Sequence, residues 1–165
     1  MDSTHVMTQD DIIALVTGLP GAVATTAREG DGSPQVAWGD TFFYDSEDGT
    51  AATAQRMPFA TIVTKDYDGF DTVSDLNRPG VFRLNINVGR AAFADLLGYP
   101  PAAYPGHAAH VDHTATDRLI PHPVYAAQGW VAVLNPAAAT AAQARALLTA
   151  AHDRAVARRA GARRQ

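Results

Sequence analysis

The sequence predicts a single α+β domain, in which an antiparallel sheet of about five or six strands has helices packed on one face. The first observation behind this is size, because 165 residues with 47% apolar content suit one domain with an ordinary core. The second is the expected element order α-β-β-β-β-α-β-α, whose tight links favour antiparallel pairing. The third is segment 81–88, where apolar and polar side chains alternate as in a strand with one buried face.

The first expected elements are a short helix and a β-hairpin. Thr8 followed by Asp11 is typical of a helix N-cap, and the apolar stripe that follows ends at Gly18. Segments 22–29 and 35–44 are expected to be strands, because the link between them, Gly-Asp-Gly-Ser-Pro, has the chemistry of a hairpin turn.

A loop and two more strands are expected in the middle of the chain. The polar segment 45–57 is the best candidate for a mobile loop. Strands are expected over 59–65 and 81–88, and the link 66–79 between them is rich in Asp and Gly and ends in a turn.

The last expected elements are a helix, a strand and a longer helix. The helix after Gly89 should end at Gly98, where two prolines follow soon after. Segment 125–134 is expected to be a strand, and an alanine-rich helix is expected over about 139–159. Within the single domain 1–165, residues 160–165 are expected to be a frayed C-terminal tail.

Charge and composition disfavour several classes of protein. The formal net charge is −4 and the pI about 5.8, unlike the basic field of a nucleic-acid-binding protein. The arginines near the C-terminus favour a solvated helix end over a phosphate-binding arm. With no cysteine, disulfides, thiolate nucleophiles and zinc-thiolate sites are excluded. A cytoplasmic protein that does not associate with membranes is expected, since the N-terminus lacks a signal-peptide pattern and no long apolar window occurs.

The polar side of segment 81–88 is the first candidate for a binding surface. It presents Arg83, Asn85 and Asn87, although Asn is a poor strand former and surface strands usually carry Thr, Lys or Glu. A face that binds something and a solvated sheet face are equally consistent with this pattern.

Other strands are expected to bring aromatic and ionisable side chains to the same face. The candidates are Trp38, Asp40, Lys65, Tyr125 and Trp130. Together with the polar strand they would form the aromatic walls and few polar groups of a ligand pocket. Each has an ordinary alternative: the tryptophans as core residues, Asp40 as a turn or capping residue, and Lys65 as a solvated strand end. A one-residue bulge would reverse the facing of any of these strands.

Three histidines follow one another at intervals of three residues. His107, His110 and His113, with Asp112, could place imidazoles on one side of a metal ion if the segment were helical. The neighbouring Gly and Ala residues favour a solvated or structural histidine loop, and no metal is expected.

His122 is the preferred candidate for proton transfer. Pro121 and Pro123 stiffen its backbone directly before an expected strand, which would hold the ring in one direction. A general acid or base needs such placement, although a histidine that caps a turn would have the same sequence context. The sequence has no G-x-S-x-G elbow, no P-loop and no dinucleotide-binding glycine motif.

Four sequence strings together resemble a family. AWGDTFFYD, FATIVTKD, DLNRPGVFRLNINVG and HPVYAAQGWVAVLNP resemble an uncharacterised bacterial family known only as a domain of unknown function, over nearly the whole chain. The last strand and helix, GWVAVLNP followed by AHDRAVAR, are more distantly similar to MmcQ/YjbR-like proteins. That second resemblance implies a CyaY-like α+β fold, and a DNA-binding role has been proposed for some of its members. Neither implies catalytic residues.

Three functional hypotheses follow from these residues. The first is a small cofactor-independent enzyme that acts on an organic molecule, for example in secondary metabolism, by dehydration, addition or cyclisation. His122 or Asp40 would move the proton, while Arg83, Asn85 and Lys65 would stabilise an enolate-like oxygen. The second is a binding protein that holds a small ligand without chemistry. The third, less favoured, is a nucleic-acid-binding module that uses the C-terminal arginines. A monomer or a homodimer is expected.

Overall fold

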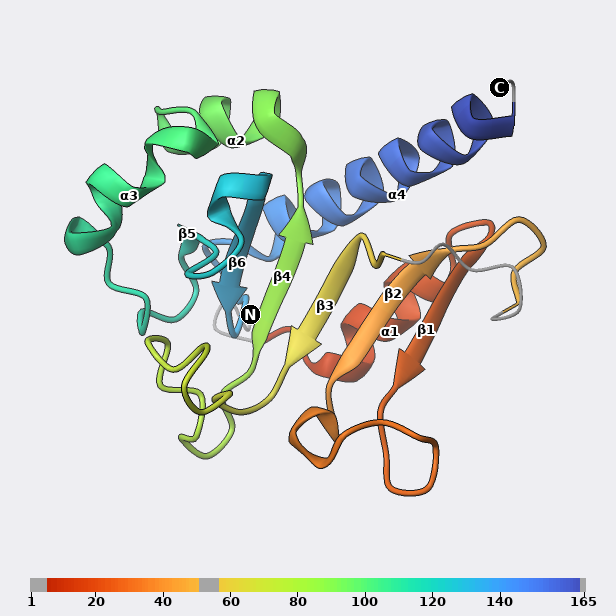
Figure 1. Cartoon of the computed structure of the whole chain (residues 1–165), viewed down its shortest axis with the longest axis horizontal. Coiled ribbons are helices and arrows are strands. Elements are labelled where there is room, and N and C mark those ends of the chain that lie inside the picture. Colours follow the sequence, from red (N-terminus) through yellow and green to blue (C-terminus); the bar gives the residue numbers. More distant parts are fainter. Residues whose placement is uncertain (1–5, 51–56, 164–165) are drawn as a thin grey trace.

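The computed structural model describes residues 6–50 and 57–163, which form a six-stranded antiparallel sheet and four α-helices (Figure 1). The predicted α+β fold is confirmed. The strand order is β1-β2-β3-β4-β6-β5. The strands are β1 (Ala22–Thr26), β2 (Thr41–Asp45), β3 (Ala60–Val63), β4 (Arg83–Asn87), β5 (Leu119–Pro121) and β6 (Trp130–Leu134). The α-helices are α1 (Gln9–Thr17), α2 (Gly89–Leu97), α3 (Tyr104–His107) and α4 (Ala141–Arg163). The 3₁₀ turns are η1 (Gln35–Ala37), η3 (Pro101–Ala103), η4 (Ala108–His110) and η5 (Ala126–Gln128).

Two predicted segments fall partly outside this description. Residues 51–56 of the predicted mobile loop are not among the described residues, and neither are residues 164–165 of the predicted tail. The first part of that tail, 160–163, continues α4 as helix.

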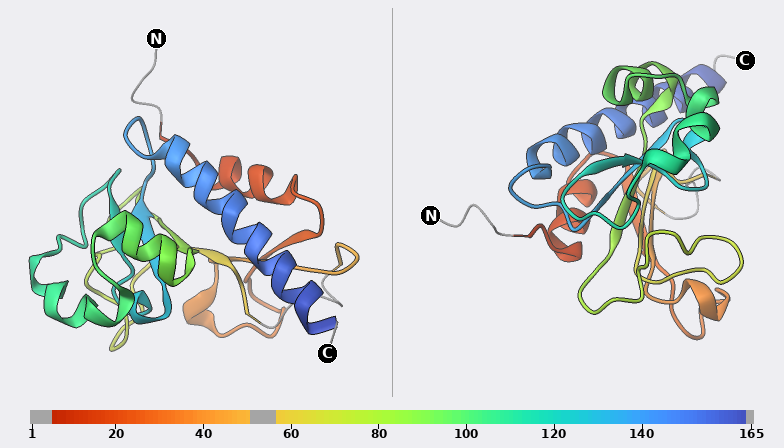
Figure 2. Two further views of the ribbon diagram at one scale, coloured as in Figure 1. Left: turned by 90° about the horizontal axis from the view of Figure 1, so that it is seen from above. Right: turned by 90° about the vertical axis from the view of Figure 1, so that its left-hand side faces the viewer.

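One face of the sheet is covered by α1 and α4 (Figure 2). The apolar residues of β4, Leu84 and Ile86, are fully buried in the core on this face. The predicted capping box of α1 is present, with Thr8 and Asp11 bonded reciprocally, and it starts the helix so that Ile12 is buried. Other core residues on this face come from β2, β3, α1, α2 and α4: Phe43, Ile62, Val16, Phe93 and Leu148.

The polar side chains of β4 therefore lie on the opposite face of the sheet, which we call the site face. Arg83, Asn85 and Asn87 alternate with the buried apolar residues, as the sequence predicted. The antiparallel register pairs Asn85 with Thr61 of β3 and pairs Asn87 with Trp130 of β6. Cross-strand partners share a face, so Thr61 and Trp130 also belong to the site face.

The predicted strand 35–44 is wrong in its first half. Its first residues form η1, and Gly39 then adopts φ 93°, a left-handed conformation that favours glycine. The Gly39 amide donates to the carbonyl of Ala27 at 2.8 Å, which turns the chain. Strand β2 begins only at Thr41, so Trp38 precedes the strand and does not share its face.

The predicted strand 125–134 is wrong in the same way. Tyr125 precedes η5, Gly129 has φ 89°, and β6 begins at Trp130. The sequence-based prediction also lacked β5, which has three residues and is therefore too short to show an alternation.

A carboxylate from another part of the chain, Asp117, holds the turn that precedes α4. Asp117 accepts hydrogen bonds from the amides of Ala137, Ala139 and Thr140 and from the Thr140 hydroxyl, at 2.7–3.0 Å. Burial raises the pKa of the Asp117 carboxyl, but these hydrogen bonds outweigh that effect and hold the pKa below its usual 3.8. Ionised Asp117 therefore stabilises the turn over residues 137–140, which leads directly into the longest helix.

We expect Asp117→Asn to lower the free energy of unfolding by about 1 kcal/mol at neutral pH, because the group that binds the turn before α4 loses its charge and one acceptor. Since the pKa is lowered in the folded state, this contribution is present above about pH 4 and is lost as the pH falls through the folded-state pKa. Urea unfolding at several pH values measures the difference. Asp153→Asn, which neutralises an exposed carboxylate of α4, is the control, and an equal loss in both variants would contradict the role of Asp117 in this turn.

Candidate functional site

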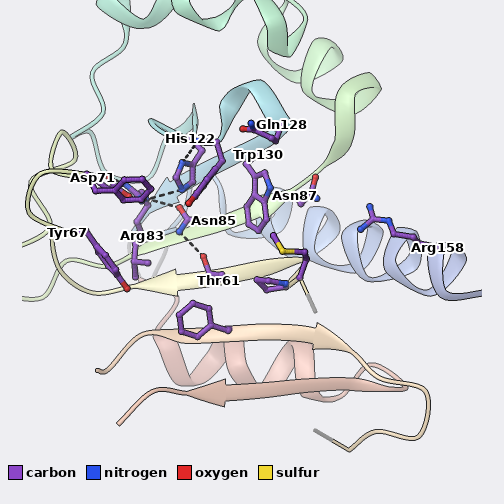
Figure 3. A pocket seen from close by; sticks show the side chains of 16 residues that line it. Thr61, Tyr67, Asp71, Arg83, Asn85, Asn87, His122, Gln128, Trp130 and Arg158 are labelled. Carbon is purple, nitrogen blue, oxygen red and sulfur yellow. Dashed lines mark hydrogen bonds and ion pairs between the residues drawn. The ribbon is translucent and has the colours of Figure 1, made fainter. Parts of the chain in front are cut away.

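The site face contains a pocket of about 500 Å³ (Figure 3). This volume lies within the range of about 300–1,000 Å³ that is common for small-molecule sites. Its apolar and aromatic lining consists of Phe42, Met57, Pro58, Val63, Tyr67, Phe70, Tyr125 and Trp130. Its polar lining consists of Thr61, Asp71, Arg83, Asn85, Asn87, His122, Gln128 and Arg158. Of the predicted site residues, this lining contains Arg83, Asn85, Asn87, His122, Tyr125 and Trp130.

Aromatic rings form one wall of the pocket. The ring of Tyr125 lies 5.0 Å from that of His122 and 6.4 Å from that of Trp130, between centroids. Phe70, on the loop between β3 and β4, approaches Tyr125 with a centroid distance of 6.2 Å. Met57, Phe70 and Tyr125 are exposed large apolar side chains at the pocket, which thus has an apolar mouth.

Arg83 is fully buried at the centre of the sheet and is paired with Asp71. Its Nη1 donates to Asp71 Oδ1 at 3.1 Å and to Ser74 Oγ at 3.0 Å, and its Nη2 donates to Asp71 Oδ2 at 2.5 Å. Its Nε donates to Asn85 Oδ1 at 2.8 Å. The guanidinium has five N–H donors, and these contacts occupy four of them. Arg83 therefore positions its neighbours, and its charge is compensated within the protein.

The Arg83–Asp71 pair holds the 67–71 loop against the site face. Tyr67 and Asp71 exchange two backbone hydrogen bonds, at 2.9 and 2.8 Å, that close this loop. Behind it, Leu76 packs with Val63 and residues of β5 and β6 in a second, smaller apolar cluster. A loop without helix or strand thus supplies one side of the pocket.

His122 caps the turn that follows it. Its Nδ1 accepts hydrogen bonds from the amides of Val124 and Tyr125, both at 3.0 Å. A neutral imidazole that accepts at Nδ1 carries its proton on Nε2. The contact of 3.4 Å between Nε2 and Arg83 Nη2 then joins two donors and is not a hydrogen bond. The capping alternative for His122 is the one that this geometry favours.

The electrostatic surroundings keep His122 neutral. Burial lowers the pKa of His122 well below its usual 6.5, and the charges of Arg83 and His113 lower it further. With Nδ1 bonded to backbone amides and Nε2 beside a guanidinium, the ring has no free lone pair for a ligand. The predicted role of His122 in proton transfer stays a prediction without geometric support.

Three predicted site residues form a separate group next to the pocket. Asp40 is fully buried and accepts hydrogen bonds from the Thr64 amide at 2.8 Å and from Lys65 Nζ at 3.2 Å. Lys65 also donates to the carbonyl of Trp38 at 2.6 Å. The Tyr67 hydroxyl donates to Asp40, and burial together with this bond raises the pKa of Tyr67. Trp38, Asp40 and Lys65 are not among the described residues that line the pocket, whereas Tyr67, which is bonded to Asp40, does line it.

Asn85 and Asn87, the other polar residues of β4, differ in their hydrogen bonding. Asn85 donates from Nδ2 to the Thr61 hydroxyl at 2.9 Å and accepts from Arg83, so it connects β3 with the ion pair. Asn87 has a buried Oδ1 that finds no hydrogen-bond partner among the residues that the structure describes. A buried polar atom of this kind costs about 1–3 kcal/mol, and its place in the pocket wall agrees with a site in which the fold tolerates unfavourable groups.

The three regularly spaced histidines do not converge. The ring of His107 stacks on Tyr99 at 3.8 Å between centroids, and His113 Nε2 lies 2.9 Å from the Tyr104 hydroxyl. His110 is exposed in η4. In the described ranges 6–50 and 57–163, no three His, Asp or Glu side chains are close enough together to hold a metal ion. The structural alternative accounts for His107 and His113.

Asp71 and Arg158 are among the lining residues that sequence reasoning missed. Asp71 lies in a loop whose Asp and Gly content indicates only a turn, and its partner Arg83 is twelve residues away. Arg158 belongs to the arginine-rich end of α4, and no pattern in the sequence indicates that this end reaches the site face. Figure 3 shows Arg158 on α4, at the margin of the residues that line the pocket.

Comparison with known proteins places the chain in a family without an assigned activity. The chain belongs to the family described as "Family of unknown function (DUF6194)", which matches residues 7–165. The expected membership of an uncharacterised family is thereby confirmed. No curated protein and no solved structure gives a significant match. The more distant similarity to MmcQ/YjbR-like proteins and the CyaY-like label stay predictions. Of the helices in the described part of the chain, none has the length and apolar character needed to cross a membrane.

We expect Asp71→Asn to lower the free energy of unfolding by about 3 kcal/mol, because it leaves the buried charge of Arg83 uncompensated. Urea unfolding at neutral pH measures this change. Asp68→Asn is the matched control, since Asp68 is exposed in the same loop, and its effect should stay below about 0.5 kcal/mol. Similar stability of the two variants would show that the ion pair does not support the loop.

Nitrogen NMR of the His122 ring should show an unprotonated Nδ1 and a protonated Nε2, with no titration near pH 6.5, where an unperturbed imidazole titrates. Because the folded-state pKa is lowered, the unfolded chain binds the proton first, so stability decreases as the pH falls from about 6.5 toward the folded-state pKa. His122→Asn keeps a capping oxygen and should remove this part of the pH dependence. A protonated Nδ1 at neutral pH would contradict the capping geometry.

Proposed function

We propose that the protein binds a small organic molecule in the pocket on the site face and that binding, without acid–base chemistry, is its function. One observation carries the proposal: the ionisable groups of the inner wall are bonded to each other or to the backbone, while the aromatic surface beside them is open. Asp71 is paired with Arg83, His122 with two amides, and Tyr67 with Asp40.

The lining suggests how such a molecule would be held. Apolar contact with Phe42, Tyr125 and Trp130 would provide most of the affinity, because burying apolar area contributes about 25 cal/mol per Å². Neutral polar groups, such as Thr61 and Gln128, would orient the ligand. Small-molecule sites commonly combine apolar contacts, which provide affinity, with a few polar groups, which fix the orientation of the ligand.

The enzyme hypothesis has less support from the same geometry. Dehydration or cyclisation needs a group that exchanges a proton with the substrate, within about 2.6–3.2 Å of the atom concerned. Asp40 lies outside the pocket lining, and both nitrogens of His122 face protein donors. Turnover of a bound ligand that is lost in His122→Asn, with affinity unchanged, would favour the enzyme over the binding protein.

The remaining expectations are weaker proposals. A nucleic-acid interface built on the C-terminal arginines has little support, because Arg159 is paired with Asp45 and Arg158 lines the pocket. We also place the protein in the cytoplasm, on the sequence features already described, such as the absence of cysteine.

The neutral fluorescent probe N-phenylnaphthylamine should bind saturably and quench Trp130 in a Trp38→Phe protein, where Trp130 is the only tryptophan left. Phe42→Ala should weaken binding about tenfold, since a buried ring contributes about 1.5–3 kcal/mol. Tyr44→Ala is the control, because Tyr44 lies on the same side of β2 but outside the pocket lining. Absence of saturable binding, or equal loss in both variants, would overturn the proposal.

A further inference from the structure

We infer that the ligand is an organic anion, such as a carboxylate, whose apolar body occupies the pocket and whose charged end lies at Arg158. This inference rests on the proposed function and adds the chemical class of the ligand. It follows from the distribution of charge around the pocket and from the way in which α4 is fixed to the sheet.

The charges of the pocket lining do not cancel. Arg83 and Asp71 form a buried pair, and His122 is neutral, so these side chains contribute no net charge. Arg158 is the remaining ionisable cation of the lining, and within residues 6–50 and 57–163 it forms no ion pair. An anion would therefore find a free positive partner at the pocket, whereas a cation would find no free carboxylate.

Contacts on both sides of Arg158 fix its position along α4. Arg154 Nη1 donates to the carbonyl of Asn87 at 3.1 Å, at the end of β4. Arg159 Nε donates to Asp45 Oδ2 at 2.6 Å, at the end of β2. These two bonds attach α4 to β4 and β2. They hold Arg158 at the pocket, so no bond made by Arg158 itself is required to position it.

Arg154 can approach β4 closely because residue 89 is a glycine. Gly89 has φ 83°, and a Cβ at this position would lie 2.7 Å from the Arg154 guanidinium carbon. Burial lowers the pKa of Arg154, and the nearby charge of Arg158 lowers it further, so the two guanidinium groups repel each other. An anionic group at Arg158 would relieve this repulsion.

The apolar lining indicates what the rest of the ligand is like. A small inorganic anion would leave the aromatic wall formed by Tyr125 and Trp130 unused, while a purely apolar molecule would leave Arg158 unused. An apolar body with one anionic group fits both features. The size of the pocket limits this body to the range of drug-sized molecules.

Two probes that share their ring system test the inference. Anilinonaphthalene sulfonate is an anion, and N-phenylnaphthylamine is its neutral counterpart. The sulfonate should displace the neutral probe from the protein, and its affinity should fall as salt is added. Arg158→Gln should weaken the sulfonate about three- to tenfold and change the neutral probe by less than about twofold, as expected for an exposed charge at a binding site.

Arg145→Gln is the matched control, because Arg145 is exposed on the same helix and outside the pocket lining. If both arginine variants weaken the sulfonate equally, or if the sulfonate does not displace the neutral probe, the anion has no specific site here and the inference fails. If the neutral probe binds and Arg158→Gln leaves the sulfonate unchanged, the inference fails while the proposed pocket function stands. If neither probe binds saturably, the proposed function itself fails.

Discussion

The buried ion pair between Arg83 and Asp71 is the interaction on which the pocket depends. A guanidinium in the central strand of a sheet is costly to remove from water unless its donors are used, and here Asp71, Ser74 and Asn85 accept from it. The pair allows the polar side of β4 to be buried, and it brings an irregular loop down onto the sheet. Replacement of the pair by apolar residues could keep the fold, but the loop would lose the bond that sets its position.

The alternation in β4 is the reason why much of the fold could be predicted. A two-residue period fixes which side chains share a face, so the opposition of Leu84 to Arg83 and Asn85 followed from the sequence. The helices on the other face, started by the capping box at Thr8, followed from equally local signals. These patterns act within a few residues, which is why most of the longer elements and the polar face were predicted correctly, while strand ends and the short elements β5 and α3 were not. At Gly39, one left-handed residue ended the supposed strand and took Trp38 away from the face to which it was assigned.

The chemistry of the site was harder to predict because it depends on contacts between distant segments. The bond from Asp71 to Arg83 joins a loop to a strand, and no periodicity marks it. His122 shows a different limit: a proline-flanked histidine serves a catalytic site and a turn cap equally well, and only the two amides at its Nδ1 distinguish them. Arg158 reaches the pocket through the angle at which a long helix crosses the sheet, which tertiary packing determines.

The 67–71 loop has one further consequence. Each end of the loop forms a bond that involves a buried carboxylate: Tyr67 donates to Asp40, and Asp71 pairs with Arg83. Phe70, which lies between them, is exposed beside Tyr125. The base of the loop is held by buried bonds, while the side chain at its apex is exposed at the pocket, so the residues that support the loop differ from the residue that faces a ligand. Exchange of residues 68–70 could alter which molecules are admitted without disturbing the framework beneath, so relatives of this protein could diverge in selectivity while sharing one scaffold.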